Sequence, residues 1–179
     1  MDSLLPVTTR DQIETTARLA AEIWNEHFPP IIGQSQVDYM VERFQSTHAI
    51  AEQIRDGVDY RLAFLADRPT AYTALIPDTQ AGRLMISKLY VKRAARGKGL
   101  GQTMLDFALD QAVRWNCATV WLTVNRYNRS AIDWYLRRGF DIVGEQDQPI
   151  GGGFFMNDYV MEQPAASTGA SNPQRPRTS

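Results

Sequence analysis

The sequence has a single cysteine, Cys117, so no internal disulfide framework can form and a reducing compartment such as the cytoplasm is expected. Its 19 lysines and arginines do not outnumber its 20 acidic residues, which argues against a nucleic-acid-binding surface. No apolar run approaches the roughly 18 residues that a membrane-spanning helix needs, and the segment MDSLLPVTTRDQ does not resemble a signal peptide. The two histidines, His27 and His48, lack partner ligands at metal-binding spacing, so no metal is expected.

Large aliphatic side chains are also missing from residues 163–179, QPAASTGASNPQRPRTS, where alanine is the largest. Such a segment cannot bury enough apolar surface to offset the entropy lost on ordering. We therefore predict a single domain over residues 1–162 and a disordered C-terminal tail over residues 163–179.

The first third of the chain has helical periodicity. A capping box, in which the side chains of Thr9 and Gln12 satisfy each other's backbone N–H groups, predicts a helix that runs to about Asn25. The prolines and the glycine of HFPPIIG are expected to stop any helix. Ser35 is expected to cap a second helix, and HAIAEQIRDG predicts a third helical or turn-rich piece.

From Asp59 the periodicity becomes that of strands. YRLAFLA and TAYTALI, separated by DRPT, predict an antiparallel hairpin, and RLMISKLYV predicts a third strand. An amphipathic helix from Gly99 to about Trp115, the apolar strand TVWLTV and a helix from Asn128 to about Arg138 follow. FDIVGEQ and FFMNDYVMEQ predict two further strands. Helices over a mixed, mostly antiparallel sheet define an α+β fold.

The stretch LYVKRAARGKGLG, residues 89–101, has the features of an anion-binding turn. Glycine lets the backbone approach a ligand or adopt positive φ, and the N–H groups at the start of the following helix bind anions. Arg96 and Lys98 add positive charge. The stretch is not a P-loop, because Gly99 stands where Ser or Thr is needed, and it lacks the third glycine of a dinucleotide fingerprint. By itself the string also fits a solvent-exposed glycine turn.

A second motif downstream, NRSAIDWYLRRGF, favours the anion-binding turn over the solvent-exposed glycine turn. Together, in this order and at this spacing, RGKGLG and NRSAIDWYLRRGF resemble the two cofactor segments of the GCN5-related N-acetyltransferases (the GNAT family), over about residues 60–161. KLYV before the turn and TVWLTV between the motifs also fit. The N-terminal helices and GGGFFMNDYVME more loosely resemble the small bacterial members that acetylate polyamines. The resemblance implies a three-layer fold, with helices on both faces of the sheet.

The resemblance further implies acetyl-CoA as co-substrate and a set of residues that bind it. The strand residues Leu89 to Val91 would splay away from Thr119 to Val124, and the acetyl-pantetheine arm would lie in the gap. Backbone N–H groups from Gly97 to Gln102 would hold the pyrophosphate. The full predicted set is Leu89, Tyr90, Val91, Arg96, Gly97, Lys98, Gly99, Leu100, Gly101, Gln102, Asn128, Ala131 and Tyr135.

Acetyl transfer needs a proton donor for the leaving thiolate and a neutral amine that attacks the thioester. Tyr135 lies where the family places the general acid, and a phenol with a pKa near 10 can protonate a thiolate whose thiol has a pKa near 8.5. Periodicity alone equally fits a core aromatic, because Tyr135 belongs to an apolar helical stripe. An amine with a pKa of about 10 must lose a proton first, so the rate should rise with pH.

The proton acceptor is missing from its usual place. Many family members carry a glutamate on the strand before the glycine turn, where this sequence has Ser87 and Lys88. Water, backbone carbonyls, or Glu26 and His27 beside FPPIIG are the remaining candidates, although Glu26 and His27 also fit a solvated helix end.

The nature of the amine stays open at this point. Acidic residues of the N-terminal helices, Glu22, Glu26, Asp38 and Glu42, would favour a cationic amine, or form an ordinary charged helix face. A polyamine-like small molecule is the first expectation. Protein N-termini or lysines are the alternative, as is an acyl-CoA-binding module without turnover. A homodimer is expected from the family.

Overall fold

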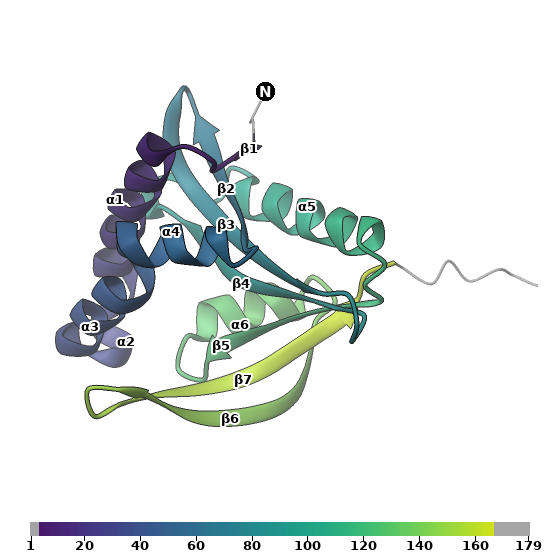
Figure 1. The fold of residues 1–179 in the computed structure, drawn as a ribbon. Coiled ribbons are helices and arrows are strands. Elements are labelled where there is room, and N and C mark those ends of the chain that lie inside the picture. Colours follow the sequence, from purple (N-terminus) through teal and green to yellow (C-terminus); the bar gives the residue numbers. More distant parts are fainter. Residues whose placement is uncertain (1–3, 167–179) are drawn as a thin grey trace, which may run out of the picture.

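The structure, a computed structural model, describes residues 4–166. Its elements are β1 (Leu4–Pro6), α1 (Arg10–His27), α2 (Pro29–Ile32), α3 (Gln34–Gln45), α4 (Thr47–Arg55), β2 (Asp59–Leu65), β3 (Arg68–Asp78), β4 (Arg83–Val91), a 3-10 turn (Arg93–Ala95), α5 (Leu100–Arg114), β5 (Thr119–Asn125), α6 (Arg129–Leu136), β6 (Asp141–Gly151) and β7 (Phe154–Pro164). Helices α1, α3 and α4 lie on one side of the sheet, and α5 and α6 lie on the other (Figure 1). The predicted three-layer α+β fold is confirmed.

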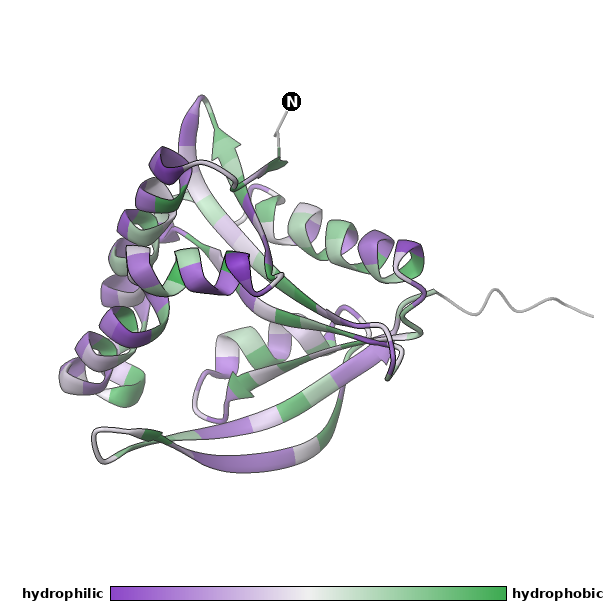
Figure 2. Ribbon diagram, viewed as in Figure 1, coloured by the Kyte–Doolittle hydropathy of each residue, from purple (hydrophilic) through white to green (hydrophobic). Residues whose placement is uncertain are grey.

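The seven strands form one sheet in the order β1-β2-β3-β4-β5-β7-β6. All neighbours are antiparallel except β4 and β5, which are parallel. The edge strand β6 is largely exposed and its middle is hydrophilic (Figure 2), which suits a strand with one unpaired side.

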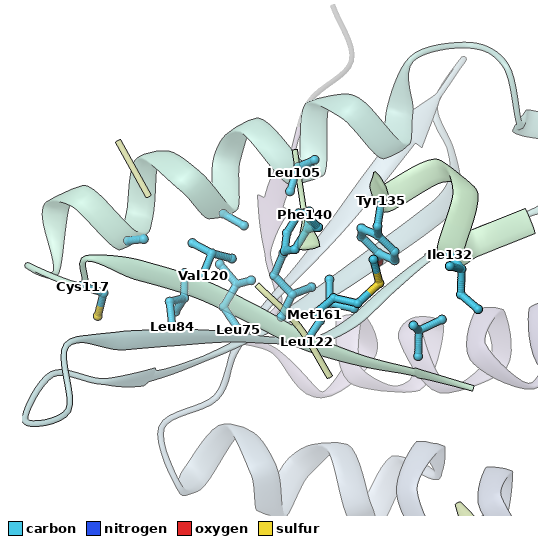
Figure 3. Close-up of a cluster of buried hydrophobic side chains, with 14 residues drawn as sticks. Leu75, Leu84, Leu105, Cys117, Val120, Leu122, Ile132, Tyr135, Phe140 and Met161 are labelled. Carbon is cyan, nitrogen blue, oxygen red and sulfur yellow. The ribbon is translucent and has the colours of Figure 1, made fainter. Parts of the chain in front are cut away.

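Each face of the sheet has its own apolar core. On the face covered by α5 and α6, side chains such as Leu105, Leu122 and Phe140 interdigitate (Figure 3). On the face covered by α1 and α4, Ile23 and Ile50 pack against aromatic side chains of β2 and β3. Two buried layers hold the sheet rigid, so its strand ends make a fixed frame for a binding site.

The parallel seam between β4 and β5 is short. Register pairs join Arg83 to Thr119, Leu84 to Val120 and Met85 to Trp121. Beyond Met85 the two strands separate, and a register shift at the β3–β4 ladder leaves Ser87 as an extra residue. The family resemblance predicted this splay, and the structure shows it. It leaves the backbone edges of both strands open between the two halves of the sheet.

A second contact joins the two halves at the opposite end. Tyr39 of α3 donates a hydrogen bond from Oη to the carbonyl of Ile150 (2.7 Å) at the tip of the β6–β7 hairpin. Its ring packs against Phe154, with centroids 5.2 Å apart. A Cβ on Gly152 would lie 2.9 Å from the Tyr39 ring, so glycine is needed for this close approach.

Most predictions for individual helices and strands are confirmed, with a few corrections. The capping box of Thr9 and Gln12 is present and α1 stops before the prolines. However, Pro29 to Ile32 form a one-turn helix of their own, because proline is tolerated in a first helical turn. The cap of α3 is Gly33 rather than Ser35. Strand β1 was not predicted, and β6 extends further than FDIVGEQ.

Two residues predicted to belong to the tail, Gln163 and Pro164, are part of a strand. Strand β7 runs to Pro164, because Gln163 and Pro164 continue its register with Val120 and Thr119 of β5. Residues 167–179 lie outside the described residues.

Candidate active site

A cavity of about 1000 Å³ opens where β4 and β5 separate. It is bounded by α1 and α3 on one side, by the glycine turn and α6 on the other, and by β6 and β7 at its end. Every side chain or glycine of the predicted co-substrate set lines it except one. The exception is Lys98, which is exposed because it stands between two glycines at the outer surface of the turn. The separated motifs thus meet at one place.

The glycine turn has the conformation that an anion site requires. Gly97 and Gly99 have φ of 76° and 85°, a region that favours glycine. Gly99 is the N-cap of α5, and the first intrahelical bond is from the N–H of Thr103 to its carbonyl (2.9 Å). The N–H groups of the first turn of α5 therefore have no partner inside the helix. These groups and the helix dipole attract a phosphate.

Arginines supplement the turn, and two of them, Arg137 and Arg138, were not singled out from the sequence. Arg96, Arg137 and Arg138 line the cavity near the turn. Arg138 donates from Nε to Oε1 of Gln102 (2.8 Å) and lies over the ring of Trp134 at 3.7 Å. This contact holds the side chain of Gln102, a residue whose backbone N–H was predicted to bind the pyrophosphate. The sequence signal for Arg137 and Arg138 was RRGF, at the end of the second motif.

Gly101 has a packing role as well. A Cβ at this position would lie 3.1 Å from Cζ2 of Trp134. Its missing side chain therefore lets α5 and α6 approach closely, which places the second motif beside the first.

Asn128, at the start of α6, is buried and contacts His27 from the end of α1. The Nε2 atom of His27 lies 3.1 Å from Oδ1 of Asn128, and Nδ1 lies 3.4 Å from Nη2 of Arg96. Burial lowers the pKa of His27, while its bond to Asn128 opposes that shift. Both nitrogens of the neutral ring are thus engaged, one as donor and one as acceptor, which weakens its candidacy as the proton acceptor.

Tyr135 combines the two roles that periodicity left open. It is buried against Trp134 and Phe140, with centroids 5.0 and 5.3 Å away, and it belongs to the core under α6 (Figure 3). It also lines the cavity. Burial raises its pKa above the ordinary value, so the phenol keeps its proton at neutral pH. Tyr90, across the cavity, is close enough to interact with any charge on Tyr135.

Two buried ionisable residues beside the cavity were not singled out as site residues. Lys88 of β4 is 6% exposed and donates to the carbonyl of Phe44 (2.9 Å), to Oε1 of Gln53 (2.7 Å) and to the hydroxyl of Tyr60. Burial lowers the pKa of Lys88 to about 7. Asp158 of β7 is 2% exposed, and its Oδ2 atom has no hydrogen-bond partner among the residues that the structure describes. The sequence signal was a charge inside the apolar strand FFMNDYVME.

The acidic residues of the N-terminal helices do not reach the cavity. Glu22 pairs with Lys92 (2.5 Å), and the Glu26 carboxylate accepts a bond from the backbone N–H of Arg93 (3.2 Å). Asp38 accepts a bond from Gln34 of its own helix. These acids follow the alternative of a charged helix face, and the candidate base Glu26 is directed away from the lining.

The residues present fit acetyl-CoA. The turn offers free N–H groups and guanidinium groups to a pyrophosphate, and the open edges of β4 and β5 offer backbone groups to an amide-bearing arm. Tyr135 and Asn128 lie along the same cavity. Among residues 4–166, no cluster of histidine, cysteine and carboxylate side chains could hold a metal ion. Nor is any helix of that range long and apolar enough to cross a membrane.

Comparison with known proteins agrees with this geometry. The model of the acetyltransferase (GNAT) family matches residues 19–140. An uncharacterized N-acetyltransferase of Mycobacterium tuberculosis is 30% identical over 146 residues, which cover 81% of this chain and 92% of that protein. A spermine/spermidine N(1)-acetyltransferase of Bacillus subtilis is 32% identical over 71 residues, covering 39% of this chain and 47% of that protein.

A solved structure with a similar fold contains the expected ligand type. The PaiA N-acetyltransferase of Thermoplasma acidophilum, in complex with coenzyme A, has a TM-score of 0.76 at 18% identity, covering 92% of this chain and 99% of that one. The extent of the family match shows that the chain belongs to the GNAT acetyltransferase family. It is an N-acetyltransferase, and its co-substrate is acetyl-CoA.

Proposed function

We propose that the protein acetylates a primary amine of a small cationic molecule of the polyamine class by direct attack. The observation that carries this proposal is the lining of the cavity beyond the glycine turn. There, Trp24, Phe28 and Tyr90 form an aromatic cluster, with Trp24 and Phe28 stacked at 4.2 Å. Aromatic faces attract ammonium groups. The partial likeness to the Bacillus spermine/spermidine enzyme supports the same class.

Amide side chains complete this part of the cavity. The lining includes the glutamines Gln36, Gln45, Gln53, Gln146 and Gln148. The oxygens of Gln45 and Gln53 already accept bonds from Tyr72 and Lys88, so those of Gln36, Gln146 and Gln148 can accept hydrogen bonds from amino groups without adding charge. An amine with several nitrogens along an apolar chain matches a cavity lined by both aromatic and amide groups.

The residues have the following proposed roles. Bound acetyl-CoA supplies an acetyl thioester. The N–H groups of Gly97 to Gln102, with Arg96, hold the pyrophosphate, and the open edge of Leu89 to Val91 and the Asn128 side chain orient the arm. Ala131 leaves room beside it. Tyr135 donates the proton that the departing sulfur takes up as the amine forms its bond to the acetyl carbon.

Release of free CoA thiol from acetyl-CoA tests the proposal, with a panel of spermidine, spermine, amino acids, aminoglycosides and short peptides with free N-termini or lysines. Faster release with spermidine and spermine than with the other amines is expected. Fastest release with peptides would instead establish the protein-acetylating alternative. No release from any amine, in a sample whose melting temperature acetyl-CoA still raises, would favour the binding module.

We also propose that the protein is located in the cytoplasm and forms a homodimer. The free, buried thiol of Cys117 supports the cytoplasm, and a homodimer is the family expectation, which sedimentation of the purified chain tests.

A further inference from the structure

The cavity has an uneven distribution of charge. Its positively charged side chains are Lys88, Arg96, Arg137 and Arg138. Within the described part of the chain, its one lining carboxylate is Asp158. The three arginines lie around the glycine turn, where a pyrophosphate is expected, whereas Asp158 comes from β7 at the other side of the open seam. The two ends therefore suit ligand parts of opposite charge.

The position of Asp158 is set by the sheet. It pairs in register with Asn125 of β5 and with Gln146 of β6. Asn125 is the last residue of β5, beyond the point where β4 and β5 separate, so Asp158 is placed beside the open seam rather than under it. Asp158, Tyr90 and Tyr135 all line the cavity, so the carboxylate borders the same space as the proposed acid.

Asp158 forms no ion pair within residues 4–166. The Nη atoms of the nearby Arg126 are bound to Glu145 (3.0 Å) and to Asp147, while its buried Nε atom has no hydrogen-bond partner among these residues. Burial raises the pKa of Asp158 to about 6, while bonding to Thr123 and the charge of Arg126 oppose that shift and Asp147 adds to it. A buried carboxylate with an unpartnered oxygen is costly, and such a group in a native fold calls for a missing partner.

We propose that Asp158 binds the ammonium group of the acceptor amine and takes one of its protons, so that it supplies the carboxylate that β4 lacks. This inference rests on the proposed function and adds the base to it. Asp158 lines the cavity, so an amine bound there can reach its carboxylate. The amine loses one N–H proton to a carboxylate oxygen and becomes R–NH2 with a free electron pair, and Asp158 becomes a neutral acid. The neutral amine then attacks the acetyl carbon, Tyr135 gives its proton to the departing sulfur, and the new amide nitrogen loses its second proton to the Tyr135 oxygen, which restores the phenol.

The other candidates are engaged. Lys88 spends its hydrogen bonds on three acceptors of the N-terminal half, and His27 uses both ring nitrogens. At pH 7 a carboxyl with a pKa near 6 is mostly ionised, as a base must be, and it is a stronger base than an exposed aspartate.

The substitution Asp158→Asn tests this inference, because it keeps the shape and removes the charge. Spermidine binding to the CoA-saturated protein, measured by calorimetric titration, should weaken by at least about 30-fold, while CoA binding stays unchanged. In the wild type, kcat/KM for spermidine should fall below pH 6, and Asp158→Asn should lose that acidic limb along with about 100-fold of the rate at pH 7. Asp158→Glu, which keeps the carboxylate, should retain the limb.

Glu145→Gln is the matched control, since Glu145 is a largely exposed carboxylate that also contacts Arg126. It should leave spermidine binding and the pH profile unchanged. Spermidine binding and an acidic limb that persist in Asp158→Asn would overturn the inference, as would an equal loss of CoA binding, which indicates a structural role. If the wild type acetylates no amine but binds spermidine through Asp158, the proposed function fails while the ammonium site stands.

Discussion

The two halves of the sheet present different chemistry to the cavity between them. The first half, β1–β4, contributes Lys88, and the second half, β5–β7, contributes Asp158; both are nearly inaccessible to solvent. Lys88 has three hydrogen-bond acceptors around its ammonium, whereas one oxygen of Asp158 has none. Burial of a charge therefore does not by itself mark a reactive group. Whether the hydrogen-bonding capacity is already used separates a structural charge from one that awaits a ligand.

The backbone shows a related contrast. Strand β4 pairs with β3 along nearly its whole length but with β5 only from Arg83 to Met85. The same strand thus serves as interior of one half-sheet and as open edge of the cavity. An exposed edge normally invites unwanted strand pairing, and here the covering helices enclose it for a ligand.

Replacing Lys88 by methionine tests its structural role in the first half. In the unfolded chain the amine keeps its proton up to about pH 10.5, but in the folded protein it loses the proton near pH 7. Between these values unfolding takes up a proton, so the free energy of unfolding should rise with pH, by at most about 5 kcal/mol over the window, and stay flat below pH 7. Denaturant unfolding from pH 6 to 10.5 should show this slope in the wild type and not in Lys88→Met. A slope that persists would belong to another group.

Tyr135→Phe tests the acid contributed from the second half. We expect kcat to fall by about 100-fold to 1,000-fold, because a positioned proton donor contributes that much, while the Kd for acetyl-CoA stays near the wild-type value. Tyr159→Phe, on β7 and packed against the same core, is the control and should keep the wild-type rate. An unaltered kcat in Tyr135→Phe would contradict the assignment of the acid.

Leu84→Ala tests whether the short seam positions the halves. Leu84 is fully buried at the seam, so its truncation should lower the free energy of unfolding by about 3 kcal/mol. Leu62→Ala, in β2 and equally buried, should cost about the same. Calorimetry should find weaker acetyl-CoA binding in Leu84→Ala alone. Equal affinities in the two variants would show that the seam does not control the cavity.

Gly99→Ala should have the smallest effect. Its φ of 85° disfavours a side chain, but no atom lies within 4 Å of a built Cβ, so the cost is conformational, about 1–2 kcal/mol. Because the strain falls on the turn, acetyl-CoA should bind about 10-fold more weakly. Gly57→Ala has φ of 97° and equal space, so it should lose similar stability without losing affinity. An acetyl-CoA Kd unchanged in Gly99→Ala would argue against the turn as its site.

The local pattern predicted much of the fold because helix caps and apolar spacing act over a few residues. The capping box at Thr9 and the glycine at the start of α5 are examples. The family resemblance, rather than periodicity, supplied the splay of β4 and β5 and the co-substrate residues that line the cavity. Lys98 shows the limit of a motif, because a string does not tell which side of a turn a side chain takes.

Asp158 and Lys88 could not have been assigned from the sequence. Whether a buried charge is paired depends on residues far along the chain, such as Phe44 and Gln53 for Lys88. The same holds for Arg126, whose Nη atoms are bound to Glu145 and Asp147 of another strand rather than to Asp158. The partners of these buried charges are known only from the folded structure, in which the strands are in register.

The contact of Tyr39 with the β6–β7 hairpin has a mechanical consequence. The cavity between the half-sheets is held at one end by the pairs from Arg83 to Met85 and at the other by the bond from Tyr39 to Ile150. Figure 1 shows α3 near the tip of the β6–β7 hairpin. A cavity that is held at both ends cannot open by a hinge motion, and it can widen only if its two sides bend outward. The energy needed to bend the two sides rises with the width of the ligand but does not depend on its length. The fold should therefore select ligands by their cross-section, binding narrow chains and excluding bulky rings of the same charge.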